Sequence, residues 1–318
     1  MADNYKVEII SSKEKNRLMF EVYEDSLYEK KANIHGTCVK FFTDCEEFKQ
    51  MWDDNFKPIS DDIRPHARVF AISDSQKKFR VLYEPESKTV IIKNCDYYGW
   101  VKSIALGLVA DFFEDFTSEH RRFSIHGSFI DSSGNGVGII GPSGSGKTTL
   151  TYGLLLDKAN NFLTDDWFFI RLTKNDTLVF SSEKNSYIRD DLAINWPQFK
   201  EKLADIRKDQ RGRAVVDVKR MFGNDRIREQ SILKAVVLLT REQGREVFRQ
   251  LTPSEALNFM VKKDFCNPHQ LLRTKKKLRE RKEFFYELFS RVPVYILNTI
   301  EKPQQSLERL KGILNDGK

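Results

Sequence analysis

Short apolar runs separated by turn-forming residues dominate the first hundred residues of this chain. Runs rich in β-branched and aromatic side chains predict strands, and helical spacing predicts a helix at residues 45–56. The predicted strands cover residues 5–10, 17–23, 38–42, 68–72, 79–83 and 89–93. No chemical motif stands out here, so we expect residues 1–100 to form an α/β region whose role the sequence does not reveal.

The first strong helical pattern covers residues 97–116, where large apolar side chains recur every four residues. We interpret this apolar face as core packing. A second domain is expected over residues 101–318, in which strands and helices are mixed. Its strands are predicted at residues 122–130, 138–140, 162–170, 171–179, 214–221, 232–239 and 293–298. Its helices are predicted at residues 149–156, 252–261, 268–290 and 304–314.

The clearest motif of the chain lies at residues 141–148. They read Gly-Pro-Ser-Gly-Ser-Gly-Lys-Thr and fit the phosphate-loop pattern G-x-x-x-x-G-K-[ST] at every fixed position. Glycines let backbone N–H groups turn inward toward a phosphate, Lys147 supplies positive charge, and the Thr148 hydroxyl can bind Mg²⁺. An apolar strand precedes the loop and a helix follows it, which predicts a nucleoside triphosphate site at a helix N-terminus. The residues predicted to contact the nucleotide are Gly141, Pro142, Ser143, Gly144, Ser145, Gly146, Lys147, Thr148 and Thr149.

The composition of the chain is consistent with a nucleotide-binding protein and adds few further constraints. The 318 residues carry a net charge of +7, which suits phosphate-bearing substrates or an acidic partner without arguing for nucleic acid. The four cysteines are scattered, so neither a zinc site nor a disulfide framework is indicated. The start of the chain lacks a signal-peptide pattern, and no apolar run is long enough to span a bilayer. We therefore expect a reduced, cytoplasmic protein without membrane contact.

Further sequence features narrow the class of nucleotide-binding protein. The chain has no L-S-G-G-Q segment, which argues against a transporter ATPase, and no N-K-x-D segment, which argues against guanine specificity of the common kind. Two adjacent carboxylates, Asp165 and Asp166, follow the phosphate loop early, at the edge of a predicted strand. Near Mg²⁺, such a pair can divide metal binding and proton acceptance between its members.

Five separated motifs, taken in order, resemble the HPr kinase/phosphorylase family, bacterial phosphate-loop enzymes that phosphorylate a serine hydroxyl on a carrier protein. The similar stretch covers about residues 124–251. Its motifs are Ile-His-Gly at 125–127, the phosphate loop, Phe-Leu-Thr-Asp-Asp at 162–166, the segments 209–218 and 221–223, and a stretch ending in Arg249. The resemblance implies an α/β phosphate-loop kinase core of the HPr kinase/phosphoenolpyruvate carboxykinase type, with a mixed sheet and the phosphate loop between a strand and a helix. It also implies the use of ATP and Mg²⁺.

The resemblance further implies roles for individual residues. Asp166 would accept the proton of the acceptor hydroxyl, and His126 would orient the acidic pair. Lys147 and Arg249 would stabilise negative charge on the phosphoryl group. The residues implied at the metal are Thr148, Asp165 and Asp209. At position 209 the family has glutamate where this chain has aspartate.

Both ends of the chain depart from the family, whose docking elements are not recognisable before residue 101 or after residue 251. Residues 264–270 read Asp-Phe-Cys-Asn-Pro-His-Gln, and a basic run follows at 273–282. The apolar stripe of the predicted helix would consist of Leu271, Leu278, Phe285 and Leu288. A solvated face is one interpretation of the basic run, and docking of an acidic partner or an RNA backbone is the other.

Three functions are therefore open. The first is an ATP-dependent kinase, a phosphotransferase acting on a hydroxyl, serine in the first instance, of a protein or peptide other than the family's carrier. The second is a small-metabolite kinase, and the third is an ATP-binding regulator without transfer activity. An enzyme is favoured over the regulator because the chain retains Asp166, Lys147 and Arg249. The sequence leaves homo-oligomer formation open.

Overall fold

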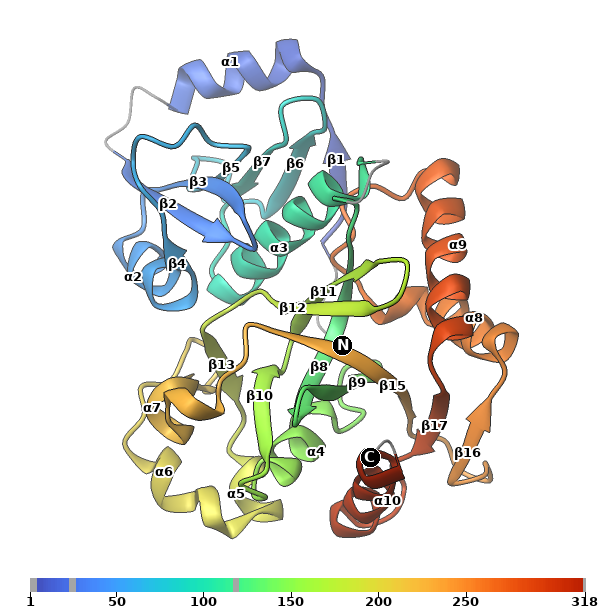
Figure 1. Ribbon diagram of the computed structural model, residues 1–318. Coiled ribbons are helices and arrows are strands. Elements are labelled where there is room, and N and C mark those ends of the chain that lie inside the picture. Colours follow the sequence, from blue (N-terminus) through green and yellow to red (C-terminus); the bar gives the residue numbers. More distant parts are fainter. Residues whose placement is uncertain (1–4, 23–26, 117–119, 317–318) are drawn as a thin grey trace. The chain divides into compact units, whose positions relative to one another are not determined.

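The chain is shown in Figure 1 as a computed structural model that describes residues 5–22, 27–116 and 120–316. It divides into two compact units. Unit 1 comprises Met1–Asp115 and the short segment His269–Leu272, and unit 2 comprises Phe116–Pro268 and Arg273–Lys318. Among the helices of the described ranges, none has the length and apolar character needed to cross a bilayer.

Unit 1 contains a seven-stranded mixed sheet within its described residues. In sheet order the strands are β1 (Val7–Ile9), β6 (Arg80–Glu84), β7 (Thr89–Lys93), β5 (Ala67–Ile72), β3 (Thr37–Thr43), β2 (Tyr28–Ile34) and β4 (Lys57–Pro58). The helices are α1 (Ser12–Val22), α2 (Glu46–Asn55) and α3 (Tyr98–Glu114). β3, β5 and β7 are parallel neighbours, and the antiparallel pairs β2–β3 and β6–β7 lie on either side of β5. The expected α/β character of this region is confirmed.

Helix α1 occupies residues for which we predicted a strand at 17–23. Leu18 and Val22 lie one helical turn apart, and both pack in a core cluster with Phe70 of the sheet. Phe20 lies between them in sequence and is 75% exposed. A short apolar run fits the two-residue period of a strand and the roughly 3.6-residue period of a helix equally well. The core contacts of Leu18 and Val22, made at helical spacing, therefore decided that this segment is a helix.

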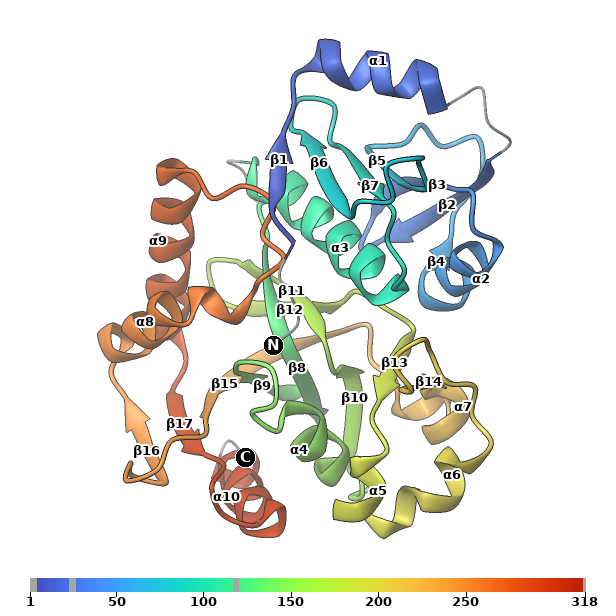
Figure 2. The same ribbon diagram turned by 180° about the vertical axis from the view of Figure 1, so that it is seen from behind.

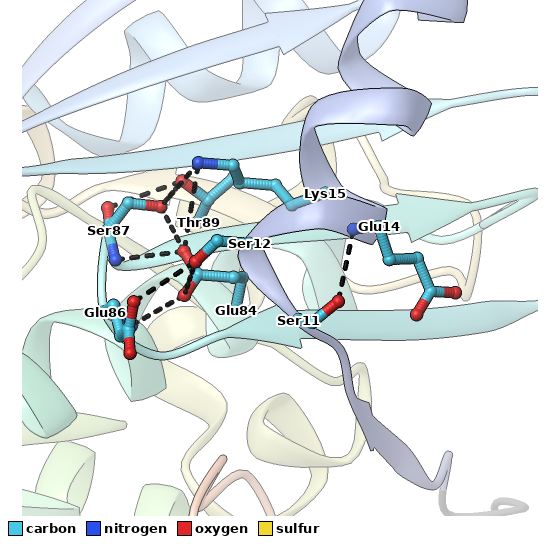
Figure 3. A network of polar contacts seen from close by, with 8 residues as sticks. All are labelled: Ser11, Ser12, Glu14, Lys15, Glu84, Glu86, Ser87 and Thr89. Carbon is cyan, nitrogen blue, oxygen red and sulfur yellow. Dashed lines mark hydrogen bonds and ion pairs between the residues drawn. The ribbon is translucent and has the colours of Figure 1, made fainter.

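A polar network fixes the first turn of α1 to the turn between β6 and β7 (Figure 3). The buried Glu84 carboxylate accepts a hydrogen bond from Ser12 Oγ at 3.2 Å. It also accepts from the backbone N–H groups of Glu86 and Ser87, each at 3.0 Å. Burial alone would raise the pKa of Glu84, but the hydrogen bonds from Ser87 and its neighbours outweigh burial and hold the pKa below its ordinary value. The network therefore depends on an ionised carboxylate.

Helix α3 belongs to unit 1, so the boundary between the two units lies at residue 115, whereas we expected it at residue 100. The buried Asp111 of α3 accepts hydrogen bonds from the Tyr83 hydroxyl at 2.6 Å and from Lys88 Nζ at 2.5 Å. The segment His269–Leu272, which we expected in a helix of the second domain, also lies in unit 1, where His269 forms a 2.9 Å hydrogen bond with the Tyr5 hydroxyl. Both differences arise from contacts between residues far apart in the sequence.

Unit 2 contains an eight-stranded mixed sheet within its described residues. Along the main path its strands are β10 (Asn160–Thr164), β8 (Phe123–Ser132), β11 (Trp167–Leu172), β12 (Thr177–Ser181), β15 (Gln230–Thr240), β17 (Val294–Asn298) and β16 (Phe248–Leu251). β9 (Asn135–Ile140) lies off this path and pairs with both β8 and β15. A small second sheet pairs β13 (Asn185–Ile188) with β14 (Ala214–Asp217). The helices are α4 (Lys147–Leu154), α5 (Asp191–Asn195), α6 (Lys200–Ala204), α7 (Val218–Phe222), α8 (Pro253–Lys262), α9 (Lys275–Arg291) and α10 (Pro303–Asp316).

Helices cover both faces of this sheet (Figures 1 and 2). Alternate residues of β15 point to opposite faces, so Val237 and Leu239 join one core cluster while Val236 and Leu238 join another. The first cluster includes residues of α4 and α10, and the second includes residues of α8 and α9. β9 and β17 each run parallel to β15, which brings their carboxyl ends to one edge of the sheet. The expected mixed sheet with helices packed against it is therefore confirmed.

Two helix predictions and one strand prediction in unit 2 had different outcomes. Thr252 starts α8 with the predicted capping box, because it accepts from the Glu255 N–H and the Glu255 side chain accepts from the Thr252 N–H. The strand predicted at 214–221 ends at Asp217, whose carboxylate caps α7. The long helix begins at Lys275, after the Thr274 cap, and not at residue 268.

The buried face of α9 also differs from the predicted apolar stripe. Leu278 is 40% exposed, and Leu271 lies outside the helix. Lys277 and Arg281 instead point inward with Phe284, Phe285, Leu288 and Phe289. The basic run is thus only partly solvated, since two of its cations are buried.

Candidate active site

The phosphate loop joins the carboxyl end of β9 to the first residue of α4, as the sequence predicted. Gly144 and Gly146 have left-handed backbone angles, with φ of +79° and +98°, which glycine adopts without strain. At Gly141 a Cβ atom would lie 2.6 Å from Ser145 Oγ, so any larger residue would push against the loop. The three glycines shape an open turn ahead of a helix N-terminus, the arrangement that binds phosphate.

Lys147 lies inside this loop. Its ammonium group donates to the carbonyl oxygens of Gly141 at 2.7 Å and Pro142 at 3.3 Å, and the residue is buried. Burial lowers the pKa of Lys147, and the negative charges of Asp166 and Asp165 oppose this lowering. A bound phosphate would replace the carbonyl partners and favour the charged ammonium further.

A second anchor holds the loop from the neighbouring strand. Thr299 directly follows β17, and its hydroxyl contacts the carbonyl oxygens of Ser145 at 2.9 Å and Thr240 at 3.1 Å. The loop is therefore tied to the ends of β15 and β17. The sequence analysis missed Thr299, although its place directly after a predicted strand is a signal that could have suggested it.

The strand register brings His126 and Asp166 together. β8 and β11 are antiparallel, and His126 is paired with Trp167, the residue after Asp166. His126 Nε2 lies 2.9 Å from Asp166 Oδ1, and the Gly127 N–H donates to the Asp166 carbonyl oxygen at 2.8 Å. The side chain of Asp166 is 31% exposed, whereas Asp165 is buried. Asp166 is thus the member of the pair that an incoming hydroxyl can reach.

The other ring nitrogen of His126 has a partner that no motif indicated. His126 Nδ1 lies 2.8 Å from the backbone carbonyl oxygen of Cys266, which follows α8. The sequence analysis missed this contact because any residue has a backbone carbonyl, so its identity carries no signal.

The contacts of Asp209 do not connect it to the phosphate loop or to the His126–Asp166 pair. Its carboxylate accepts from the Arg213 backbone N–H and Nε, both at 2.9 Å, and from the Arg211 N–H at 3.0 Å. Asp209 is buried in the turn that it closes. A metal-ligand role for Asp209 stays a prediction, and it would require Arg213 to release the carboxylate.

The guanidinium of Arg249 is also occupied by other partners in the structure. It lies on β16, at the edge of the sheet, and its guanidinium pairs with Glu255 at 3.0 Å and Glu246 at 3.8 Å. These pairs are half exposed, so they contribute little stability and can exchange for other anions. The role of Arg249 at the phosphoryl group remains a prediction.

The predicted role of Thr148 and Asp165 at Mg²⁺ also stays a prediction. Mg²⁺ is usually held by one or two carboxylates together with substrate phosphates and water, so Thr148 and Asp165 would suffice as protein ligands. Within residues 5–22, 27–116 and 120–316, no three His, Cys, Asp or Glu side chains converge as a cage for a metal ion. Ser145 Oγ is buried inside the loop without a hydrogen-bond partner, a polar atom that an occupied loop could satisfy.

Comparisons with known proteins show partial similarity to enzymes named HPr kinase/phosphorylase. No family model matches the chain. The HPr kinase/phosphorylase of Chlorobium limicola is 33% identical over 142 residues, which are 45% of this chain and 37% of that protein. The HPr kinase/phosphorylase of Variovorax paradoxus is 30% identical over 152 residues, which are 47% of this chain and 41% of that protein. The matches thus span less than half the length of these relatives.

Among solved structures, the Hpr(Ser) kinase/phosphatase from Coxiella burnetii aligns over 61% of this chain and 98% of that chain. The alignment has a TM-score of 0.35 and 16% sequence identity. It is the sequence matches that carry the relationship, and they identify the chain as a divergent, partial relative of the HPr kinase/phosphorylases.

Proposed function

We propose that this chain is an ATP-dependent kinase that transfers a phosphoryl group to a serine hydroxyl of a protein or peptide. The observation that carries the proposal is the strand register: Gly127, the residue after His126, is paired with Ile140, the last residue before the phosphate loop, and His126 contacts Asp166. The similarity to proteins named HPr kinase/phosphorylase supports ATP as the donor.

Each residue would contribute one physical effect. The N–H groups of the loop and the Lys147 ammonium would hold the terminal phosphates and offset their charge. Thr148 and Asp165 would hold Mg²⁺, which supplies further positive charge at the phosphates. Asp166 would accept the hydroxyl proton as the oxygen forms its bond to phosphorus and ADP departs. His126 would keep the Asp166 carboxylate in place.

Two other functions compete with this proposal. A small-metabolite kinase would use the same loop and the same base, so only the acceptor differs. An ATP-binding regulator would need the loop but not an exposed carboxylate held by a histidine. The half-exposed Asp166 therefore favours an enzyme over the regulator.

The Asp166→Asn variant tests the proposal with γ-labelled ATP. The amide keeps the size of the side chain but cannot accept the proton. We expect Mg·ATP affinity measured by calorimetry to stay within a few fold, and label transfer to a serine-peptide library to fall by roughly 10²–10⁴. The matched control is Asp157→Asn, at an exposed position of unit 2. Transfer that survives in Asp166→Asn and is lost in Asp165→Asn would reverse the two roles. Transfer unchanged in both variants would refute the proposal.

A further inference from the structure

Three consecutive residues after α8 have left-handed backbone conformations. Asp264, Phe265 and Cys266 have φ angles of 49°, 54° and 53°, and none of them is glycine. Residues with side chains enter this region singly and at a cost, so a run of three is unusual. Strain of this kind persists only where the surroundings impose it, and it is concentrated at functional sites. The segment Asp264–Cys266 is here called the left-handed turn.

Contacts on both sides hold the left-handed turn in place. The buried Phe265 ring stacks on Phe285 of α9, with ring centroids 5.3 Å apart. The Arg273 guanidinium pairs with the Asp264 carboxylate, and it also donates to the Pro268 carbonyl oxygen at 3.2 Å. The Cys266 N–H donates to the Lys263 carbonyl oxygen at 2.9 Å.

The left-handed turn places the backbone carbonyl of Cys266 beside His126 of the candidate active site. The Cys266 carbonyl oxygen lies 2.8 Å from His126 Nδ1. A carbonyl can only accept, so this contact requires the hydrogen of His126 to be on Nδ1. Nε2 faces the Asp166 carboxylate at 2.9 Å, and that contact is attractive only when a further proton lies between the two atoms. The carbonyl thus favours a state in which His126 and Asp166 share one proton.

The thiol of Cys266 is not the functional group of this residue. Burial raises the pKa of the Cys266 thiol to about 11, although Lys147 acts against the rise. The thiol therefore stays protonated at neutral pH and is a poor nucleophile there. The backbone carbonyl makes the contact with His126.

We propose that the left-handed turn Asp264–Cys266 is a positioning element, in which the Cys266 carbonyl sets the tautomer of His126 and thereby the orientation of the Asp166 carboxylate. Its effect on phosphoryl transfer rests on the proposed function, whereas its effect on the His126 ring does not. This gives a role to a segment that lies outside the five motifs resembling the HPr kinase/phosphorylases.

Two variants of Cys266 separate the carbonyl from the thiol. Cys266→Gly removes the thiol, but glycine adopts the left-handed conformation readily and leaves the carbonyl in place. Cys266→Val also removes the thiol, but a β-branched residue strongly disfavours that conformation. Only the valine variant should misplace the carbonyl.

The test is nitrogen-15 NMR of the full chain with labelled histidine, at one fixed neutral pH and without ATP. The chain has five histidines, so a His126→Gln spectrum identifies the His126 signals. We expect a protonated Nδ1 in the wild type and in Cys266→Gly, and a different tautomer distribution in Cys266→Val. In transfer assays Cys266→Val should lower kcat at least tenfold and change the KM for ATP less than twofold, whereas Cys266→Gly, which keeps the carbonyl in place, should lose less kcat than Cys266→Val.

The wild-type spectrum alone can overturn the proposal, which keeps it testable if Cys266→Val fails to fold. A bare Nδ1 in the wild type would refute it, and so would identical ring spectra in the wild type and a folded Cys266→Val. Equal losses of transfer in Cys266→Gly and Cys266→Val would assign the role to the thiol and also refute it. The expected ring spectra without any phosphoryl transfer would support the positioning role and refute the proposed kinase function.

Discussion

At the residue scale, Lys147 is the residue proposed to offset the charge of a bound nucleotide. Its ammonium rests on two loop carbonyls, which phosphate oxygens can replace. We expect Lys147→Ala to weaken Mg·ATP binding at least roughly tenfold, because it removes a charge-assisted contact with the phosphates. Calorimetry measures the change, with the exposed Lys158→Ala as the control. Unchanged affinity in Lys147→Ala would refute nucleotide binding at this loop.

Arg249 is the residue whose predicted role is furthest from its observed contacts. Its pairs with Glu246 and Glu255 are half exposed, and exposed ion pairs contribute little stability, so Arg249 can leave them easily. If Arg249 turns to the phosphoryl group during transfer, Arg249→Ala should lower kcat roughly tenfold or more with little change in ATP affinity. Arg245→Ala is the control, since Arg245 is exposed and pairs with Glu242. Equal kinetics for the two variants would leave Arg249 as a surface residue only.

At the element scale, the buried Glu84 connects α1 to the sheet of unit 1 (Figure 3). We expect Glu84→Gln to speed amide hydrogen exchange of α1 by about tenfold, because a buried hydrogen bond to a charged group is worth about 1.5–3 kcal/mol. Glu86→Gln is the control, because Glu86 accepts from Ser12 at an exposed position. Unchanged exchange in Glu84→Gln would show that apolar packing alone holds α1.

The same carboxylate makes this attachment sensitive to pH. The folded pKa of Glu84 is below its ordinary value of 4.5, so the stabilisation is complete above that value and is lost as the pH falls through the folded pKa. The protection factors of the α1 amides, which correct for the intrinsic pH dependence of exchange, should therefore fall in the wild type toward those of Glu84→Gln under acid conditions. The protection factors of the variant should not change through this group. Parallel pH profiles for the two proteins would contradict the assignment.

At the scale of the whole molecule, the net charge of +7 and the exposed cations of α9 bear on the choice of acceptor. Lys275, Lys276 and Arg279 face solvent, whereas Lys277 is buried and would damage the fold if replaced. An acidic macromolecular acceptor that docks on α9 should show a KM that rises with salt, since exposed charges are screened over about 10 Å at 0.1 M. Replacing the three exposed cations by Gln should flatten that rise.

The control for this experiment replaces Lys13, Lys77 and Lys78 by Gln, three exposed lysines of unit 1. The control variant should keep the salt dependence of the wild type. If the α9 variant matches the wild type at every ionic strength, α9 is a solvated face and a neutral metabolite becomes the favoured acceptor.

The spacing of residues along the chain was sufficient to predict several features of this protein. The phosphate loop, its glycines and the Thr252 capping box depend on residues a few positions apart, so the sequence pattern already contains their geometry. The acidic pair was visible in the sequence, and the role of His126 came from resemblance to a family. The antiparallel register of β8 and β11 then brought His126 to Asp166. For these features the interactions that decide the structure are local or belong to one strand pair.

Other features depended on tertiary contacts that no local pattern contains. The apolar run at residues 17–23 suited a strand or a helix until packing with Phe70 chose the helix. Helix α3 was assigned to unit 1 by Asp111 and its partners on other elements. The carboxylate of Asp209 was taken by Arg213, and the left-handed turn was imposed by contacts with α9 and Arg273. The sequence by itself determined which groups could carry out phosphoryl transfer, and the tertiary structure decided which of them meet, because burial and charge pairing act between residues distant along the chain.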